Sequence, residues 1–351
     1  MTDRPFSAKA GHLVSDLSLS TGAGVIIRCI EDRPGHPWKV RGSMRIPRVL
    51  QILLVTLGLT GVLVQPSAAA APTNLAAAPG LSARTVMTVA RSLVTPDADP
   101  EGANDWRCRP TTQRPRPVVL VHGTWMNALN NWAALSPSLK EAGYCVFAVN
   151  YGAPAGSILK ATDPVPQSAQ QIAAFVDRVL AATGADQADL VGYSQGGGLL
   201  PRWYLKHEGG EGKIARLIGI APSNHGTDLS GLVTLSESLR LMGIVGRFAG
   251  QSALDQARGS EIHAQLDKDG DTVPGTEYTT IVTTADRVLT PYHNQYLTPS
   301  PGAQVTNHTI QSHCPHSWTG HVAMPFDRTV TQLVHSALDP TDRRIPQCGL
   351  L

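Results

Sequence analysis

Runs of apolar residues alternate with amphipathic segments over the C-terminal two thirds of the chain. Continuous apolar runs, unlike alternating ones, are typical of strands that are buried on both faces of a sheet. Such runs predict six strands, at 118–121, 144–149, 188–191, 214–220, 278–282 and, more weakly, 305–310. Because helical patterns lie between them, we expect the α/β class, with a mostly parallel sheet flanked by helices.

Three amphipathic segments predict the main helices. Over 168–182, apolar residues recur at steps of three and four, with Ser168 as the N-cap and Gly184 as the stop. A second helix is predicted over 195–206, where Pro201 should make the backbone irregular. The third covers 326–338. We interpret residues 117–351 as one domain.

The first 116 residues lack this pattern. A basic segment at 44–48 is followed by an apolar run over 49–64 and then by small residues up to Ala71. This order predicts a signal peptide over 44–71, because the apolar run is short for a membrane anchor. Residues 1–43 would then be an upstream leader outside the mature protein, and we expect an irregular N-terminal segment over 72–116.

Charge and cysteine content narrow the possible functions. Residues 72–351 carry 21 basic and 23 acidic side chains with no long basic run, so nucleic acid is not an expected partner. Once the leader is removed with Cys29, four cysteines remain, at Cys108, Cys145, Cys314 and Cys348. An even number in an exported chain predicts two disulfides with three possible connectivities, and the lack of a C-x-x-C pair argues against a zinc or redox motif.

The sharpest motif is G-x-S-x-G around Ser194, between a predicted strand and a predicted helix. This context places a serine on a strained turn, with its Oγ projecting from the sheet edge as a nucleophile requires. Gly192 and Gly196 are small enough for the turn to close. We therefore predict that Ser194 is the nucleophile of an acyl-transfer site, rather than part of a chance glycine-rich turn.

Such a site also needs two backbone N–H donors for an oxyanion. One donor is expected from Gln195, which follows the nucleophile, and the other from Thr124, in the loop after the strand at 118–121. The Thr124 hydroxyl could add a third. His122 precedes Ser194, whereas the base of this arrangement follows its acid, so we interpret His122 as a local hydrogen-bonding residue that shapes the loop.

The acid should follow the next-to-last strand, where Asp286 stands. The alternative for Asp286 is a capping or surface role. Asp267, Asp269 and Asp271 form a denser acidic cluster, but Tyr278 occupies the position where a calcium-binding EF-hand loop needs Glu. We therefore interpret that cluster as a solvated loop.

Six histidines follow Asp286. His308 falls in a predicted strand, His335 in the last helix, and His293 lies only seven residues past the acid. The loop before the last helix holds the other three, which are His313, His316 and His321. We predict His321 as the base because it is nearest to that helix, with His313 and His316 as the alternatives.

At four places the chain resembles the secreted bacterial triacylglycerol lipases of class 2 and, more distantly, the fungal enzyme called lipase B. These places are VLVHGTW at 119–125, GYSQGG at 192–197, APSNHGT at 221–227 and ADRVLTP at 285–291. The resemblance runs from about residue 117 to the C-terminus, and four motifs in the right order are more specific than one. The departure is the loop at 311–321, where three histidines crowd together.

The resemblance implies an α/β-hydrolase fold, a triad of Ser194, Asp286 and His321, and oxyanion donors at Thr124 and Gln195. It also implies disulfides between Cys108 and Cys145 and between Cys314 and Cys348.

With these residues, we expect a secreted triacylglycerol lipase that works through an acyl-enzyme without metal or organic cofactor. It should be a monomer that contacts lipid surfaces transiently while cleaving lipid esters at an oil–water interface. A short-chain carboxylesterase, a polyesterase or an acyltransferase would use the same triad, and a binding module would not need the complete set.

The segment 232–248 is apolar beyond what one core-facing stripe needs. It is either a lid or the wall of an acyl pocket, or else a buried helix. We mark 229–260 as a possible lid or cap.

Overall fold

The computed structural model describes residues 13–18, 26–31, 40–45, 81–228, 250–342 and 346–350. The chain divides into two compact units, Met1–Asn74 and Leu75–Leu351. In the first, the strands β1 (Leu13–Ser18), β2 (Ile26–Glu31) and β3 (Val40–Arg45) pair antiparallel in that order. The predicted leader therefore contains regular structure.

Two predicted segments, the apolar run at 49–64 and most of the possible lid, at 229–249, lie outside the described residues. Among the helices that are described, none combines the length and the apolar character needed to cross a membrane.

A parallel sheet of six strands, in the order β5-β4-β6-β7-β8-β9, organises the second unit. Its strands are β4 (Val118–Val121), β5 (Val146–Val149), β6 (Ala188–Tyr193), β7 (Ile214–Ile220), β8 (Glu277–Val282) and β9 (Gln304–Thr309). The predicted parallel sheet and all six predicted strands are confirmed, with ends that differ by at most two residues.

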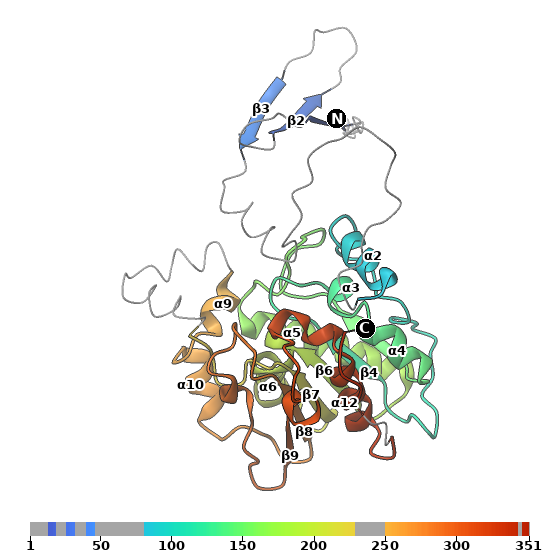
Figure 1. Cartoon of the computed structure of the whole chain (residues 1–351), viewed down its shortest axis with the longest axis vertical. Coiled ribbons are helices and arrows are strands. Elements are labelled where there is room, and N and C mark those ends of the chain that lie inside the picture. The colour runs from blue at the N-terminus through green and yellow to red at the C-terminus, as the bar shows by residue number, and fades with distance from the viewer. Residues whose placement is uncertain are drawn as a thin grey trace, which may run out of the picture. The chain divides into compact units, whose positions relative to one another are not determined.

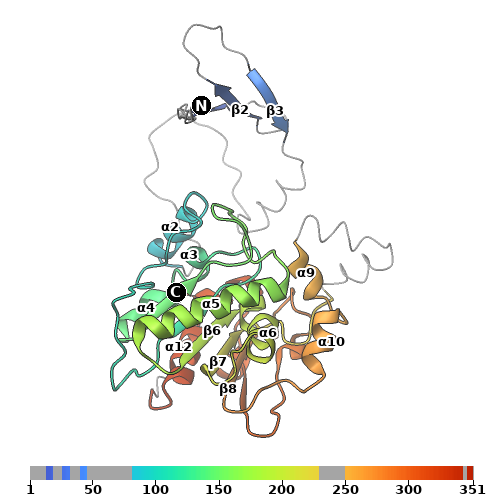
Figure 2. The ribbon, with the colours of Figure 1, turned by 180° about the vertical axis from the view of Figure 1, so that it is seen from behind.

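Helices cover both faces of this sheet. The helices α5 (Val165–Thr183) and α6 (Leu199–His207) lie on one face, seen in front in Figure 2, and α4 (Leu135–Glu141) and α12 (Arg328–Leu338) pack on the other. Successive residues of β4 alternate between the two cores and are all fully buried. Burial on both sides explains why this strand is a continuous apolar run.

The start of α5 differs from the prediction. The helix begins at Val165 after Pro164, and Ser168 lies buried inside it rather than at its N-cap. Pro166 stands in the first turn, where a missing N–H costs no intrahelical hydrogen bond. Gly184 ends the helix as predicted, in the left-handed conformation with φ of 72°.

The helix predicted over 195–206 consists of two elements, the 3₁₀ turn η1 (Ser194–Gly197) and α6. The break is at Gly198, where a Cβ atom would lie 2.4 Å from the backbone nitrogen of Ser223. Pro201 falls in the first turn of α6 and disturbs nothing there, so the irregularity was predicted with the wrong cause.

The segment predicted to be irregular, 72–116, contains the helix α2 (Ala83–Arg91). Ser82 caps it by accepting a hydrogen bond from the Thr85 N–H at 3.2 Å. Further along, Trp106 packs against Phe147 of β5. This part of the segment is therefore an ordered element of the second unit.

The described end of the possible lid also has regular structure. It contains the short helix α9 (Gln251–Asp255), which is followed by α10 (Glu261–Asp267). Leu266 of α10 joins the core on the α5 side of the sheet.

Candidate active site

Three loops at the carboxyl ends of the strands bring Ser194, Asp286 and His321 together. Ser194 directly follows β6, Asp286 follows β8, and His321 opens the 3₁₀ turn η3 (His321–Phe326) after β9. The Nε2 atom of His321 lies 3.1 Å from Ser194 Oγ, and its Nδ1 atom lies 2.8 Å from Asp286 Oδ2. Carboxyl ends of parallel strands meet at one edge, which is why residues so distant in sequence converge here.

The turn at Ser194 depends on its two glycines. Ser194 has a φ of 54°, in the left-handed region that a residue with a Cβ atom rarely adopts. A Cβ atom at Gly192 would lie 1.7 Å from the Gly196 carbonyl oxygen, and one at Gly196 would lie 2.3 Å from the His122 carbonyl oxygen. Larger residues at either position would therefore push the backbone apart and move Ser194.

Asp286 is buried and accepts four hydrogen bonds. Its Oδ1 accepts from the N–H groups of Val288 and Leu289, both at 2.8 Å. Its Oδ2 accepts from His321 Nδ1 and, at 3.0 Å, from Gln295 Nε2. Burial by itself would raise the pKa of Asp286, but the hydrogen bonds to His321 and the two N–H groups hold it below its usual value. The carboxylate therefore stays charged at neutral pH.

His321 is held in one tautomer. The Asp286 carboxylate can only accept, so Nδ1 carries the proton and Nε2 is left to accept from the Ser194 hydroxyl. The Tyr193 hydroxyl donates to the His321 carbonyl oxygen at 3.0 Å, which fixes the backbone of the same residue. In this arrangement the imidazole can take the proton of Ser194.

The other histidines of this region lie elsewhere. His313 ends the short helix α11 (Ile310–His313), with its Nε2 3.4 Å from Nδ1 of His308 on β9. His316 is exposed, and His335 contacts Ser138 of α4. Among the described residues, His321 is the histidine that forms a hydrogen bond with Ser194 Oγ.

The predicted oxyanion residues face each other across the site. The Thr124 hydroxyl donates to Gln195 Oε1 at 2.6 Å and accepts from Gln256 Nε2 at 2.9 Å. The hydroxyl hydrogen of Thr124 is thus donated to Gln195. The prediction that this hydroxyl could act as a third oxyanion donor is therefore wrong for this arrangement. Among the backbone hydrogen bonds of the described turns and loops, none uses the N–H of Thr124 or of Gln195, and their role as oxyanion donors stays a prediction.

His122 has the local role that was predicted. It is fully buried, its Nδ1 donates to the Gly123 carbonyl oxygen at 2.9 Å, and its ring stacks on Tyr151. Burial lowers the pKa of His122 to about 3, so the ring is neutral at ordinary pH. It supports the loop that carries Thr124.

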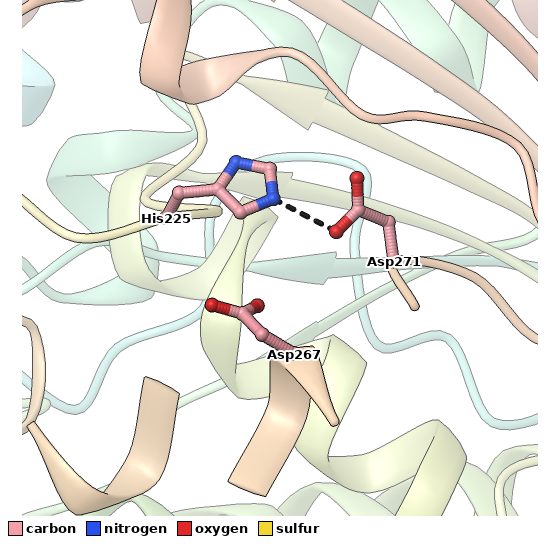
Figure 3. Close-up of side chains that lie close together, drawn as sticks. All are labelled: His225, Asp267 and Asp271. Atoms are coloured by element: carbon pink, nitrogen blue, oxygen red, sulfur yellow. Dashed lines mark hydrogen bonds and ion pairs between the residues drawn. The ribbon is translucent and has the colours of Figure 1, made fainter. Parts of the chain in front are cut away.

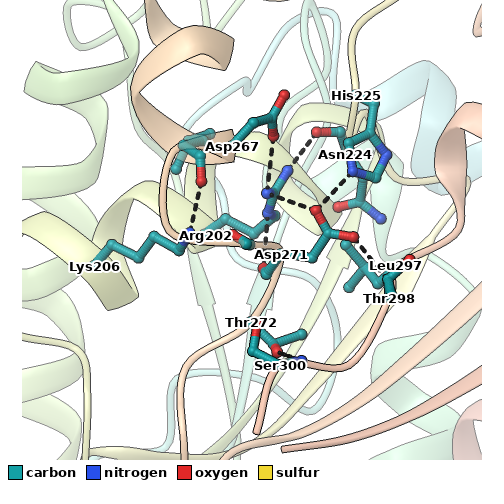
Figure 4. A network of polar contacts seen from close by, with 12 residues as sticks. Arg202, Lys206, Asn224, His225, Asp267, Asp271, Thr272, Leu297, Thr298 and Ser300 are labelled. Atoms are coloured by element: carbon teal, nitrogen blue, oxygen red, sulfur yellow. Dashed lines mark hydrogen bonds and ion pairs between the residues drawn. The ribbon is translucent and has the colours of Figure 1, made fainter.

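One group of side chains outside the triad has the composition of a metal site. His225, Asp267 and Asp271 bring their ligand atoms within 4.8 Å of one another (Figure 3). However, the buried guanidinium of Arg202 lies 3.2 Å from Asp267 and 3.3 Å from Asp271 (Figure 4). Arg202 already balances both carboxylates, so we interpret the group as an ion-pair network.

This network corrects the interpretation of the acidic cluster as a solvated loop for Asp271, whereas Asp267 and Asp269 are exposed, as predicted. Asp271 is mostly buried and binds both Arg202 and His225. Neither partner could be predicted from sequence spacing, because Arg202 lies on α6 and His225 lies in the loop after β7.

Both disulfides that the resemblance implied are present. Cys108 pairs with Cys145, and Cys314 pairs with Cys348, each with a Cα–Cα distance of 5.7 Å. The second bond ties the loop that leads to His321 to the segment beyond α12.

Comparison with known proteins places this site in a family context. Residues 116–241, which include the Thr124 loop and the Ser194 turn, match the α/β hydrolase fold family. Triacylglycerol lipases of Pseudarthrobacter phenanthrenivorans and Burkholderia plantarii are each 35% identical over 86 residues, which is 23% of this chain. The matched stretch spans about a quarter of the length of these two relatives, 25% and 23%.

The fold has a solved counterpart as well. The crystal structure of Aspergillus fumigatus lipase B superposes with a TM-score of 0.54 and 20% sequence identity, over 82% of this chain and 64% of that one. The sheet order, the turn at Ser194 and these matches agree that the chain has an α/β-hydrolase fold, and one stretch of it is similar to triacylglycerol lipases.

Proposed function

We propose that the protein is a secreted serine ester hydrolase that cleaves triacylglycerols. The observation that carries the proposal is the continuous contact from Ser194 Oγ through His321 to Asp286, at 3.1 and 2.8 Å. The triacylglycerol lipases matched by part of the chain support the same substrate class.

In the proposed reaction, His321 Nε2 removes the proton of Ser194 as Oγ attacks the ester carbonyl carbon. The N–H groups of Thr124 and Gln195 stabilise the oxyanion, and Asp286 stabilises the imidazolium that forms. His321 then returns its proton to the leaving alcohol, which leaves an acyl-enzyme on Ser194. Water, activated by the same imidazole, hydrolyses this ester and frees the carboxylate product.

Exposed apolar side chains near the site suit a lipid surface. Trp318 is 88% exposed and Val322 51%, and the two flank His321 in the sequence, while Trp125 is 37% exposed and follows Thr124. Apolar side chains both beside Thr124 and beside His321 would favour contact with an oil–water interface. No cofactor is needed in this mechanism.

The test is replacement of Ser194 by Ala. We expect kcat to fall on the order of 10⁶-fold, because the nucleophile is lost, while the thermal unfolding midpoint stays close to that of the unchanged protein. Ser138→Ala, which removes a hydroxyl that contacts His335, is the matched control and should retain activity. A fluorophosphonate should label Ser194, and labelling of another residue would refute the assignment.

Substrate class is tested with the unchanged protein on p-nitrophenyl esters of rising chain length and on emulsified triacylglycerols. We expect hydrolysis of the emulsions and little activity on matched anilides. Activity confined to acetate and propionate esters would instead indicate the short-chain esterase alternative. Transfer of the acyl group to an added alcohol in preference to water would indicate an acyltransferase.

The proposal of secretion rests on the signal-peptide pattern over 44–71 and on the two disulfides. Disulfides persist in oxidising compartments outside the cytosol. N-terminal sequencing of the protein from culture medium should give a first residue near Ala71. Recovery of the protein in membranes with residues 49–64 still attached would favour the anchor interpretation.

A further inference from the structure

The side-chain amide of Gln295 contacts the carboxylate of Asp286. Gln295 ends the 3₁₀ turn η2 (Tyr292–Gln295) and is 1% exposed. Its Nε2 donates to Asp286 Oδ2 at 3.0 Å, and this oxygen is the one that accepts from His321 Nδ1. Two donors therefore share the oxygen that orients the base.

The orientation of the Gln295 amide follows from its neighbours. Nε2 also lies 3.3 Å from the Leu289 carbonyl oxygen, so the nitrogen faces two acceptors. A flipped amide would place Oε1 against a carboxylate and a carbonyl, with no hydrogen between them. The amide thus has one favourable orientation, with Nε2 toward Asp286.

The backbone around Gln295 is held by the loop after β7. Asn224 Nδ2 donates to the Gln295 carbonyl oxygen at 2.6 Å. Next to it, the backbone N–H of His225 donates to the Asn294 carbonyl oxygen at 3.2 Å, and His225 Nδ1 donates to the same oxygen at 2.9 Å. The turn η2 is therefore fixed to this loop by three hydrogen bonds.

That loop is fixed in turn by the ion-pair network of Figure 4. Arg202, with a fully buried side chain, donates to the Asn224 carbonyl oxygen at 2.5 Å and pairs with Asp271. Asp271 also accepts from His225 Nε2 at 2.8 Å. A chain of contacts thus leads from Arg202 of α6 through Asn224 and Gln295 to Asp286.

We propose that Gln295 is a positioning residue for the pair formed by His321 and Asp286, and that Asn224 and the Arg202 network hold it in place. The inference rests on the proposed function, since it concerns the acid of that same site. Among the described residues, the hydrogen bonds of the Gln295 side chain reach Asp286 and Leu289 rather than Ser194. It acts by fixing the plane of the carboxylate and by withdrawing electron density from Oδ2.

The sign of the expected effect follows from this contact. A donor to Oδ2 stabilises the charged carboxylate, so its removal raises the pKa of Asp286 and concentrates negative charge beside His321 Nδ1. The pair of His321 and Asp286 then holds its shared proton more tightly. The acidic limb of the activity profile, which reports this pair, should therefore move to higher pH.

The test variant is Gln295→Met, which keeps the length of the side chain and removes its donor. We expect the midpoint of the acidic limb of the kcat/KM profile to move to higher pH by about half a unit to one unit. We expect kcat to fall about 10- to 100-fold with KM unchanged, because the base is less well placed. Gln295→Asn, which keeps an amide with a shorter reach, should shift the limb in the same direction.

Gln311→Met is the matched control. Gln311 also joins loops on this edge of the sheet, donating to Thr283 Oγ1 at 2.9 Å and to the Ser317 carbonyl oxygen at 3.1 Å, with no described contact to Asp286. This variant should leave the acidic limb in place, whatever its effect on the unfolding midpoint.

A second readout does not depend on hydrolysis. The proton between His321 Nδ1 and Asp286 gives a downfield resonance in proton NMR, and its pH titration should shift in Gln295→Met as the kinetic limb does. If the folded Gln295 variants keep both the limb and the resonance of the unchanged protein, the positioning role is refuted. If Ser194→Ala fails to abolish hydrolysis, the proposed function is refuted, while the NMR titration still decides the role of Gln295.

Discussion

Two histidine–aspartate pairs lie in the same domain with the same spacing. His321 Nδ1 lies 2.8 Å from Asp286 Oδ2, and His225 Nε2 lies 2.8 Å from Asp271 Oδ1. In both pairs, hydrogen bonds to the carboxylate lower its pKa below the usual value against the opposing effect of burial. The pairs differ in the partner of the second ring nitrogen, the one that does not contact the aspartate.

The second nitrogen of His321 faces the Ser194 hydroxyl, which can donate, whereas that of His225 faces the Asn294 carbonyl oxygen, which can only accept. His225 must therefore carry protons on both nitrogens to satisfy its partners. Burial lowers the pKa of His225, but the bond to Asp271 outweighs burial, and the pKa lies above its usual value. One pair can thus exchange a proton with a nucleophile, while the other has both ring nitrogens bonded to acceptors and ties loops together.

The largest effect on kcat should come from removing His321, and removal of His225 provides the comparison. His321→Ala should lower kcat on the order of 10⁶-fold, because the base is lost, with little change in the unfolding midpoint. His225→Ala should lower the unfolding midpoint and reduce kcat by less than about 10-fold, since it acts through the position of Gln295. Steady-state kinetics and thermal unfolding of both variants make the comparison.

His313→Ala and His316→Ala are the controls for loss of an exposed histidine between β9 and His321, and both should retain most activity. Should His313 or His316 prove essential instead, the assignment of the base would be wrong although the mechanism would survive. A loss in His225→Ala as large as in His321→Ala would contradict the difference between the pairs.

A smaller effect should appear in the pH dependence of stability. The pKa of His225 is raised on folding, so its contribution is complete below about pH 6.5, the unfolded value, and is lost as pH rises through the folded value. His225→Gln should therefore be less stable than the unchanged protein by about 1 to 2 kcal/mol near pH 5.5, and the difference should shrink as pH rises. Urea unfolding at a series of pH values measures it.

The pKa of His122 shifts in the opposite direction on folding, so this residue affects the pH dependence of stability with the opposite sign. Its pKa is lowered to about 3, so protonation of the unfolded chain destabilises the fold by about 1.4 kcal/mol for each unit of pH below 6.5. This term is common to both proteins and cancels in the difference. A His225 difference that stays constant with pH would mean that the ring is neutral in the folded protein.

The sequence predicted the features that depend on local pattern. Each strand of the sheet was visible because burial on both faces demands an unbroken apolar run, and the Ser194 turn was visible because only glycine fits two positions of it. Helix ends were less predictable. Pro166 moved the start of α5 ahead of Ser168, since proline in the first turn competes with a capping serine as a start signal.

The parts of the site that were missed depend on contacts between distant segments. Gln295, nine residues past Asp286, has no neighbouring motif that distinguishes it from other polar residues of a loop. The Thr124 hydroxyl was assigned to the oxyanion because its partner Gln195 Oε1 is a side-chain contact that no spacing reveals. The prediction that Asp271 faces solvent is wrong because its partner Arg202 is 69 positions away in the sequence.

The order of the strands has a consequence for the time course of folding. Ser194 and His321 are 127 positions apart, and Asp286 reaches them only when β8 and β9 have added to β7. Pairing between such distant segments is slow, because the chain loses loop entropy before the contacts form. In a refolding experiment, the return of ester hydrolysis would therefore report when β8 and β9 have joined the sheet. It should occur later than the return of the helical circular dichroism signal.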